Sequence, residues 1–196
     1  MLFSPPKVIA TAEPTERKDE KQLPTILSYS DMDAKSVYIA GVLDKSIGHI
    51  KHGETTHFYS FGNFNSMRLI FHILKTVGPA NILMSSYGIS PKTIEGIQKR
   101  MENKEILDFR LIIDNRVRTI SPKPFDLIVR AGFNYRCTSI HAKVACIWND
   151  DWKVCLVSSQ NATDNPKIER GVIYTDPTVF DFDFKNLNDV FDKGTT

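Results

Sequence analysis

Apolar positions along the middle of the chain follow helical spacing in two places, and each place has its own start and stop signals. Five apolar residues predict a helix over 65–77: Met67, Ile70, Phe71, Leu74 and Val77. Asn65 or Asn63 can cap its start, and Gly78-Pro79 ends it. A second helix over 91–103 begins with Pro91 at its first position. Near the end of the chain, Phe180, Phe184, Leu187 and Phe191 predict a third long helix over 179–191.

Shorter apolar or alternating runs predict strands between these helices. The predicted strands cover 36–43, 56–61, 81–86, 106–113, 140–148, 152–158 and 172–174. A short helix over 124–130 ends at Gly132, residues 49–57 read as a polar loop, and Asn149-Asp150-Asp151 predicts a hairpin turn. Because strands alternate with helices and a hairpin follows, the sequence predicts an α/β fold, with a mixed β-sheet flanked by helices.

Composition adds little to this picture. Residues 1–30 contain many prolines and many charged residues of both signs, which predicts a flexible N-terminal tail. The remaining residues, 31–196, are predicted to form one domain. The net charge of +2 permits a nucleic-acid partner without demanding one. The three cysteines, the interrupted apolar start and the lack of a long apolar run predict a cytoplasmic protein with reduced thiols and no membrane span.

The candidate chemistry lies in the segment that begins at His141. Strand alternation predicts that His141 and Lys143 share a face, and the hairpin returns Ser159 and Asn161 beside them. Glu169 follows eight residues after Asn161. A nucleophilic imidazole, donors for the non-bridging oxygens and a carboxylate that sets the histidine tautomer are the groups that phosphodiester cleavage needs without a metal.

This series of residues resembles the HKD motif of the phospholipase D superfamily, and the order of predicted elements over 56–192 is similar to that family's half-domain. The resemblance implies that His141 is the nucleophile, that Lys143 and Asn161 hold the phosphate, and that Glu169 accepts from the histidine's other ring nitrogen. Because the family's site uses two histidines and this chain has one motif, it also implies a homodimer with a shared site. It implies no metal and no other cofactor.

The motif departs from the family pattern at two positions. Trp148 stands five residues after Lys143, where the family has aspartate, and Asp151 has the family's spacing when counted back from Ser159. A hairpin turn about three residues longer than usual accounts for this shift. Ser158 replaces the family's glycine.

The resemblance favours a nuclease acting on DNA, because chains of this size with one motif resemble the family's small bacterial endonucleases. Two alternatives remain open. One is a phospholipase or phosphatidyltransferase, and the other is a catalytically silent module for nucleic-acid binding or assembly. The sequence does not choose between DNA and RNA or between single and double strands.

Several residues also have a structural interpretation. Ser159 and Asn161 can shape a turn, and Glu169 can be a surface charge. Cys146 and Cys155 face each other across the predicted hairpin as small core residues rather than as a disulfide or metal pair. A metal cluster of His49, His52 and His57 is a weaker alternative. The second His-x-Lys pair, His49 and Lys51, is a decoy in a polar loop, because Met67 and Leu69 stand where the motif has serine and asparagine. Two pairs of basic residues read as solvated charges that can also touch phosphates: Arg116 with Arg118, and Lys92 with Lys99.

Overall fold

A computed structural model describes residues 34–39, 43–62 and 64–196 of the chain. The expected tail over 1–30 and the alternative cap Asn63 lie outside this part. The described strands are β1 (Ala34–Ile39), β2 (Thr55–Phe61), β3 (Ala80–Ser86), β4 (Ile106–Asp114), β5 (Asn134–Thr138), β6 (Val144–Trp148), β7 (Lys153–Ser158) and β8 (Ile168–Tyr174). The described helices are α1 (Leu43–Ser46), α2 (Ser66–Val77), α3 (Pro91–Glu102), α4 (Val117–Ile120), α5 (Pro122–Arg130) and α6 (Pro177–Lys193).

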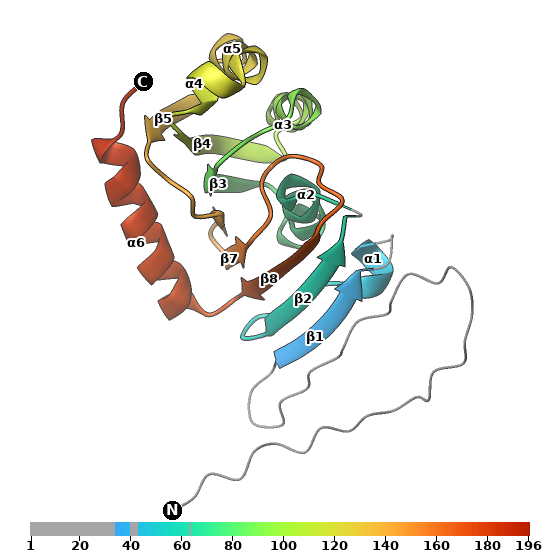
Figure 1. The fold of residues 1–196 in the computed structure, drawn as a ribbon. Helices are drawn as coiled ribbons and strands as arrows, with labels where there is room; N and C mark the ends of the chain where they lie inside the picture. Colours follow the sequence, from blue (N-terminus) through green and yellow to red (C-terminus); the bar gives the residue numbers. More distant parts are fainter. Residues whose placement is uncertain (1–33, 40–42, 63) are drawn as a thin grey trace, which may run out of the picture.

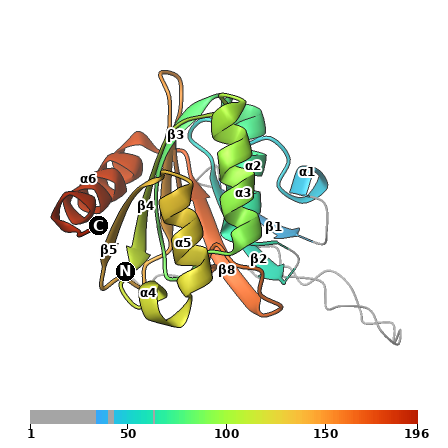
Figure 2. The ribbon, with the colours of Figure 1, turned by 90° about the horizontal axis from the view of Figure 1, so that it is seen from above.

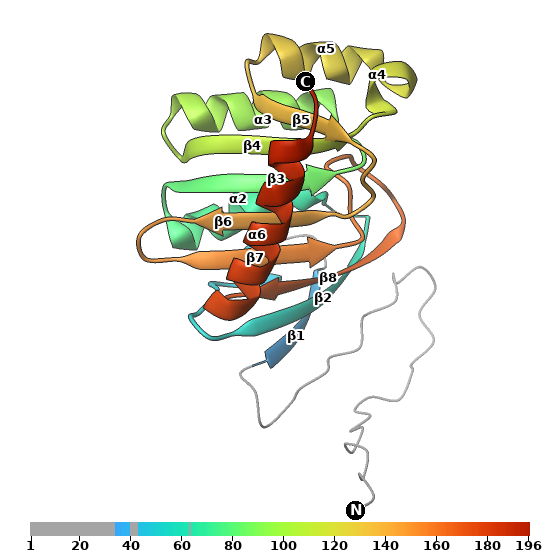
Figure 3. The ribbon, with the colours of Figure 1, turned by 90° about the vertical axis from the view of Figure 1, so that its left-hand side faces the viewer.

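The strands form one mixed sheet in the order β1-β2-β8-β7-β6-β3-β4-β5 (Figure 3). The pairs β1–β2, β3–β4 and β4–β5 are parallel, and the four pairs from β2 to β3 through β8, β7 and β6 are antiparallel. The predicted α/β class with a mixed sheet is therefore confirmed.

Helices cover both faces of the sheet, so the molecule has three layers. Figures 1 and 2 show α2, α3 and α5 on one face and α6 alone across the other. The larger apolar core lies under α2, α3 and α5 and includes Phe58, Ile73 and Phe109. The smaller core lies under α6 and includes Leu83 and Phe180. No helix within the described ranges is long and apolar enough to cross a membrane.

Local signals set the ends of the long helices. The Asn65 side chain accepts from the Arg68 N–H at 3.0 Å, and Ser90 and Asp176 cap α3 and α6 in the same way. Gly78, at φ +77°, ends α2 in a conformation that favours glycine. The three predicted long helices are confirmed. They could be predicted because the cap, the stop signal and the apolar face of each helix lie within one short segment of sequence.

Two predicted strands have different starts. The strand predicted to begin at Ile140 begins at Val144, because the Ser85 hydroxyl binds the Ala142 carbonyl at 3.0 Å and the Val144 N–H at 3.2 Å in place of the ladder. Lys143 therefore lies in the extended segment before β6. The strand predicted over 172–174 begins earlier, at Ile168, because its first half pairs with β2.

Smaller differences occur elsewhere. The strand β5 and the short helix α4 were not predicted. In β5 only Cys137 is buried, so apolar and polar residues do not alternate along the strand. His57 lies in β2, as the predicted strand over 56–61 has it, so the polar loop ends before Thr55. Leu43 begins α1 instead of ending the strand predicted over 36–43, of which residues 40–42 lie outside the described part.

The predicted hairpin between β6 and β7 is confirmed with its register. Asn149 accepts the N–H groups of Asp151 and Trp152 at 3.0 and 2.9 Å, which forms the turn. Its amide nitrogen also donates to the Val77 carbonyl at 2.9 Å and so joins the turn to the end of α2.

The end of the chain lies along the outer strand of the sheet. Cys137 in β5 and Thr195 form an antiparallel bridge, with N–H···O distances of 2.6 and 3.1 Å. This bridge follows α6, which brings the chain back across the sheet toward β5.

Candidate active site

The predicted site residues gather at one edge of the sheet. β3 and β7 run in one direction and β6 and β8 in the other, so the ends of the first two and the starts of the second two share this edge. His141 and Lys143 precede β6, Ser159 and Asn161 follow β7, and Glu169 is the second residue of β8. The fold therefore brings together groups that are 28 residues apart in sequence, from position 141 to position 169.

His141 and Lys143 are in direct contact. The Lys143 Nζ lies 3.1 Å from the His141 Nδ1 and donates to the His141 carbonyl at 2.6 Å. The His141 side chain is exposed, whereas Lys143 is only 9% exposed. An imidazole thus faces solvent with an ammonium group behind it.

The burial of Lys143 changes its acid–base behaviour. Burial lowers the pKa of Lys143 from its ordinary value, and the nearby Glu169 acts in the opposite direction. A partly desolvated cation attracts an anion more strongly than a solvated one, because water screens it less. Lys143 is therefore suited to bind a phosphate oxygen.

The carboxylate of Glu169 is fixed by hydrogen bonds from Ser159 and Asn165, near the start of β8. The Ser159 hydroxyl donates to one Glu169 oxygen, and the Asn165 amide donates to the other at 2.7 Å. The Arg170 N–H in turn donates to the Ser159 hydroxyl at 3.0 Å. Glu169 is 8% exposed, so the interpretation as a surface charge is wrong. Its contacts within this chain are to Ser159 and Asn165, and acceptance from a histidine ring stays a prediction.

Asn161 lies in the loop after β7, and its neighbour fixes this loop. Gln160 is buried and its amide donates to the Ser60 hydroxyl and the Phe64 carbonyl, both at 3.1 Å. The Asn161 carbonyl accepts from the Ser66 N–H at 3.4 Å. Its side-chain oxygen is buried without a hydrogen-bond partner in the described structure. The amide nitrogen is thus the end of this side chain that suits a phosphate oxygen. Sequence reasoning missed Gln160, since a glutamine in a loop carries no distinctive pattern.

Two residues beside His141 were not placed in the site by the sequence. The Tyr87 ring lies 5.5 Å from the His141 ring, centroid to centroid, at an angle of 60°. The Arg116 guanidinium lies 4.8 Å from the centre of the same Tyr87 ring. Arg116 and Arg118 would share a face only on an extended segment, and the structure has no such segment there because α4 begins directly after Arg116. The position of Arg116 just after a buried strand was the available signal.

A groove of about 350 Å³ lies between α2 and α3, close to the loop that carries Asn161. Its lining includes Arg68, Lys92 and Arg100. The Asn65 amide donates to Asp164 at 2.9 Å and so ties the groove to that loop. The groove therefore extends the positive character of the site along one face of the molecule.

The histidines outside the motif have other contacts. His49 contacts the Thr76 hydroxyl at 3.0 Å, His52 stacks on Trp152 at 3.7 Å, and His57 contacts Arg170 at 3.3 Å. Across the described ranges, no three histidines, cysteines or acidic residues form a group that could hold a metal.

The cysteines and the turn residues have structural roles. Cys146 and Cys155 are register partners on β6 and β7, as predicted, and both are buried free thiols. Hydrogen bonding with Cys146 and burial raise the pKa of the Cys155 thiol. Trp148 packs edge-on against Phe184 at 4.9 Å, and Asp151 is exposed in the turn.

Replacing Glu169 by glutamine is expected to move the alkaline limb of the pH–rate profile to lower pH. If Lys143 holds a phosphate, its ammonium must be charged there, and Glu169 partly offsets the lowering of its pKa by burial. Without the carboxylate charge, burial acts unopposed, so Lys143 loses its proton at a lower pH. The measurement is kcat/KM across neutral and alkaline pH. Asp151→Asn, which removes an exposed carboxylate, is the control, and an unmoved limb in Glu169→Gln would contradict this prediction.

Comparisons with known proteins bear on the fold. A scan against protein-family models gave no match, and a search of the curated proteins found no relative. Among solved structures, a phospholipase D family member, Nuc from Salmonella typhimurium, is similar at a TM-score of 0.55 and 20% identity, over 71% of this chain and 95% of the other. NucT from Helicobacter pylori is similar at a TM-score of 0.53 and 14% identity, over 72% and 99%. Polyphosphate kinase from Porphyromonas gingivalis is similar at 0.54 and 12%, over 72% and 26%.

These likenesses show that the chain has the phospholipase D fold. The resemblance first drawn from the residues at 141–169 is thereby confirmed at the level of the fold.

Proposed function

We propose that this chain is a metal-independent phosphodiesterase of the phospholipase D type that cleaves DNA as a homodimer. One observation carries the proposal: an exposed His141 ring contacts a buried Lys143 ammonium at 3.1 Å, at the sheet edge where Ser159 holds Glu169. In a phospholipase D fold, this pairs a nucleophile with a fixed cation for the phosphate.

The first step is attack on phosphorus by one His141. A neutral ring whose Nδ1 accepts from Lys143 carries its proton on Nε2, which is the form that donates to a leaving oxygen. Attack through Nε2 needs the proton on Nδ1 instead. A bound phosphate draws the Lys143 ammonium to its non-bridging oxygen and so releases Nδ1. Nε2 then gives its proton to water, Nδ1 takes a proton from water, and the Nε2 lone pair is free to attack. The N–P bond then forms as the P–O bond to the leaving group breaks.

The second histidine comes from a second copy of the chain. His141 of the partner subunit protonates the leaving oxygen, then takes a proton from water as that water attacks phosphorus and the N–P bond breaks. The two Lys143 and two Asn161 side chains hold the non-bridging oxygens in both steps. A two-fold axis through the site satisfies this requirement, because each subunit then contributes the same surface.

The charge near the site supports a nucleic acid over a lipid. Arg116 is exposed beside His141, and Lys92 and Arg100 line the groove next to the Asn161 loop. A nucleic-acid strand presents repeated phosphates that such residues can contact. Exposed apolar residues near the site include Ile168 and Tyr59, which lie on neighbouring strands beside the charged Arg170.

Purified protein incubated with labelled single- and double-stranded DNA in excess EDTA tests the proposal. We expect cleavage that survives EDTA, together with a DNA fragment attached to the denatured protein through an acid-labile bond, as a phosphohistidine requires. Absence of cleavage by a folded dimer would favour the lipid enzyme or the silent module. Cleavage that EDTA abolishes would contradict the histidine mechanism.

A further inference from the structure

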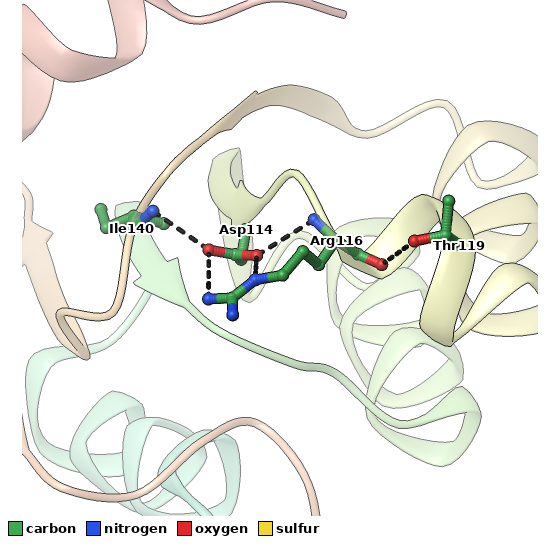
Figure 4. A network of polar contacts seen from close by, with 4 residues as sticks. All are labelled: Asp114, Arg116, Thr119 and Ile140. Atoms are coloured by element: carbon green, nitrogen blue, oxygen red, sulfur yellow. Dashed lines mark hydrogen bonds and ion pairs between the residues drawn. The ribbon is translucent and has the colours of Figure 1, made fainter.

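A buried carboxylate at the end of β4 binds both an exposed arginine and the backbone that leads to His141. Asp114 is 2% exposed and accepts the Arg116 N–H and Nε at 3.0 and 2.8 Å (Figure 4). It also accepts the Ile140 N–H at 3.2 Å, one residue before His141. The same carboxylate thus sets the positions of Arg116 and of the segment that carries the histidine.

The Arg116 side chain is held in place although most of it faces solvent. It is 61% exposed, and its guanidinium lies over the Tyr87 ring, whose edge meets the His141 ring. The Thr119 hydroxyl donates to the Arg116 carbonyl at 3.0 Å, which fixes its backbone at the start of α4 (Figure 4). The hydrogen bonds from Arg116 lower the pKa of Asp114, so both groups stay charged. An arginine held in this way loses little conformational entropy when it binds a ligand.

A purely structural role explains only part of this arrangement. Asp114 needs a positive partner because a buried charge without one is destabilising. That need does not require the guanidinium to be exposed, or to lie on an aromatic ring that contacts the candidate nucleophile. Both features place an oriented, solvent-facing cation one aromatic ring away from the candidate nucleophile.

We propose that Arg116 binds the phosphate next to the scissile one in a polynucleotide strand. Asp114 engages Nε and Nη2 of the guanidinium, and the remaining N–H groups suit a second oxyanion. This inference rests on the proposed function and names its substrate class. A polynucleotide has a neighbouring phosphate on the strand, whereas a simple phosphodiester has none, so the two classes of substrate separate the role of Arg116 from the chemistry at His141.

The test compares Arg116→Gln with wild type on two substrates. Thymidylyl-thymidine has one phosphodiester and no neighbouring phosphate, and an oligothymidylate has many. We expect Arg116→Gln to lower kcat/KM on the oligothymidylate by about 10- to 100-fold, since one charge-assisted contact to phosphate is lost, and to change it less than about twofold on the dinucleoside. Wild type itself should favour the oligothymidylate.

Two further variants keep the test decisive. Arg116→Lys retains a cation for Asp114, and it should show a smaller loss in the same direction even if Arg116→Gln does not fold. Arg118 is an exposed arginine that lies over the Phe125 ring of α5 at 5.3 Å instead of over Tyr87, so Arg118→Gln should behave as wild type. Equal losses on both substrates, or no loss on either, would overturn the inference. If wild type cleaves neither substrate, the proposed function fails. In that case, fluorescence anisotropy with labelled oligothymidylate tests the role of Arg116 separately, by comparing the affinities of wild type and Arg116→Gln. Equal affinities would overturn the inference.

Discussion

His141→Ala is expected to reduce DNA cleavage in EDTA by about 10⁴-fold or more, because deleting a covalent nucleophile removes the reaction path itself. The side chain is exposed but accepts from the buried Lys143 ammonium, which keeps the His141 carbonyl as a partner, so the free energy of unfolding should fall by only about 1 kcal/mol. The measurements are kcat/KM on labelled DNA and a denaturant unfolding curve. His49→Ala is a matched control, since His49 is an exposed histidine in the chain's other His-x-Lys sequence.

Mixing subunits extends this prediction to the shared site. If each site needs two His141 residues, a dimer of one wild-type and one His141→Ala subunit is inactive. After subunit exchange, activity should therefore fall as the square of the wild-type fraction. A linear fall would mean that each chain works alone and would contradict the dimeric mechanism. The variant should also lose the acid-labile link to DNA.

Gly171→Ala is expected to destabilise the protein by about 3 kcal/mol, as overpacking in a tight core does. A Cβ at this position would lie 2.6 Å from Phe58 Cε1 and 2.8 Å from Ser158 Cβ. Gly171 pairs with Phe58 on β2 and with Ser158 on β7, so neither backbone can move away without breaking the sheet. For a domain of this size, the melting temperature should fall by roughly 10 °C.

Two variants test the cause of this loss. Gly88→Ala is the matched control, because a Cβ there would meet only the Thr163 methyl group at an ordinary 3.7 Å. It should change stability by less than about 0.5 kcal/mol. Adding Phe58→Leu to Gly171→Ala should cost less than the two single changes together, since the smaller side chain relieves the clash. Additive losses would mean that Phe58 does not cause the strain.

The sequence predicted those parts of the fold that depend on neighbouring residues. α2 was predictable because Asn65, the apolar stripe and Gly78 lie within one short segment. The β6–β7 hairpin was predictable for the same reason, and with it the approach of His141, Lys143, Ser159 and Asn161. β5 was not predictable, because it has no apolar alternation and its partners, β4 and Thr195, are distant in sequence.

The surroundings of the candidate site depend on contacts that no local pattern encodes. Tyr87 follows β3, Arg116 follows β4 and His141 precedes β6, and only the order of these strands in the sheet makes them neighbours. The start of β6 shows the same limit. Alternation predicted a strand through Lys143, whereas the Ser85 hydroxyl from β3 replaces the ladder there.

The bridge between Cys137 and Thr195 reduces the tendency of this protein to aggregate through β5 in crowded solution. An open border strand presents free N–H and C=O groups, which is the surface on which proteins recruit strands from other molecules. Thr195 occupies the N–H and C=O groups of Cys137 in β5, with N–H···O distances of 2.6 and 3.1 Å. It thereby protects that border from aggregation, at the side of the sheet remote from β1. Association through the candidate site edge can then proceed without competition from strand-to-strand pairing at β5.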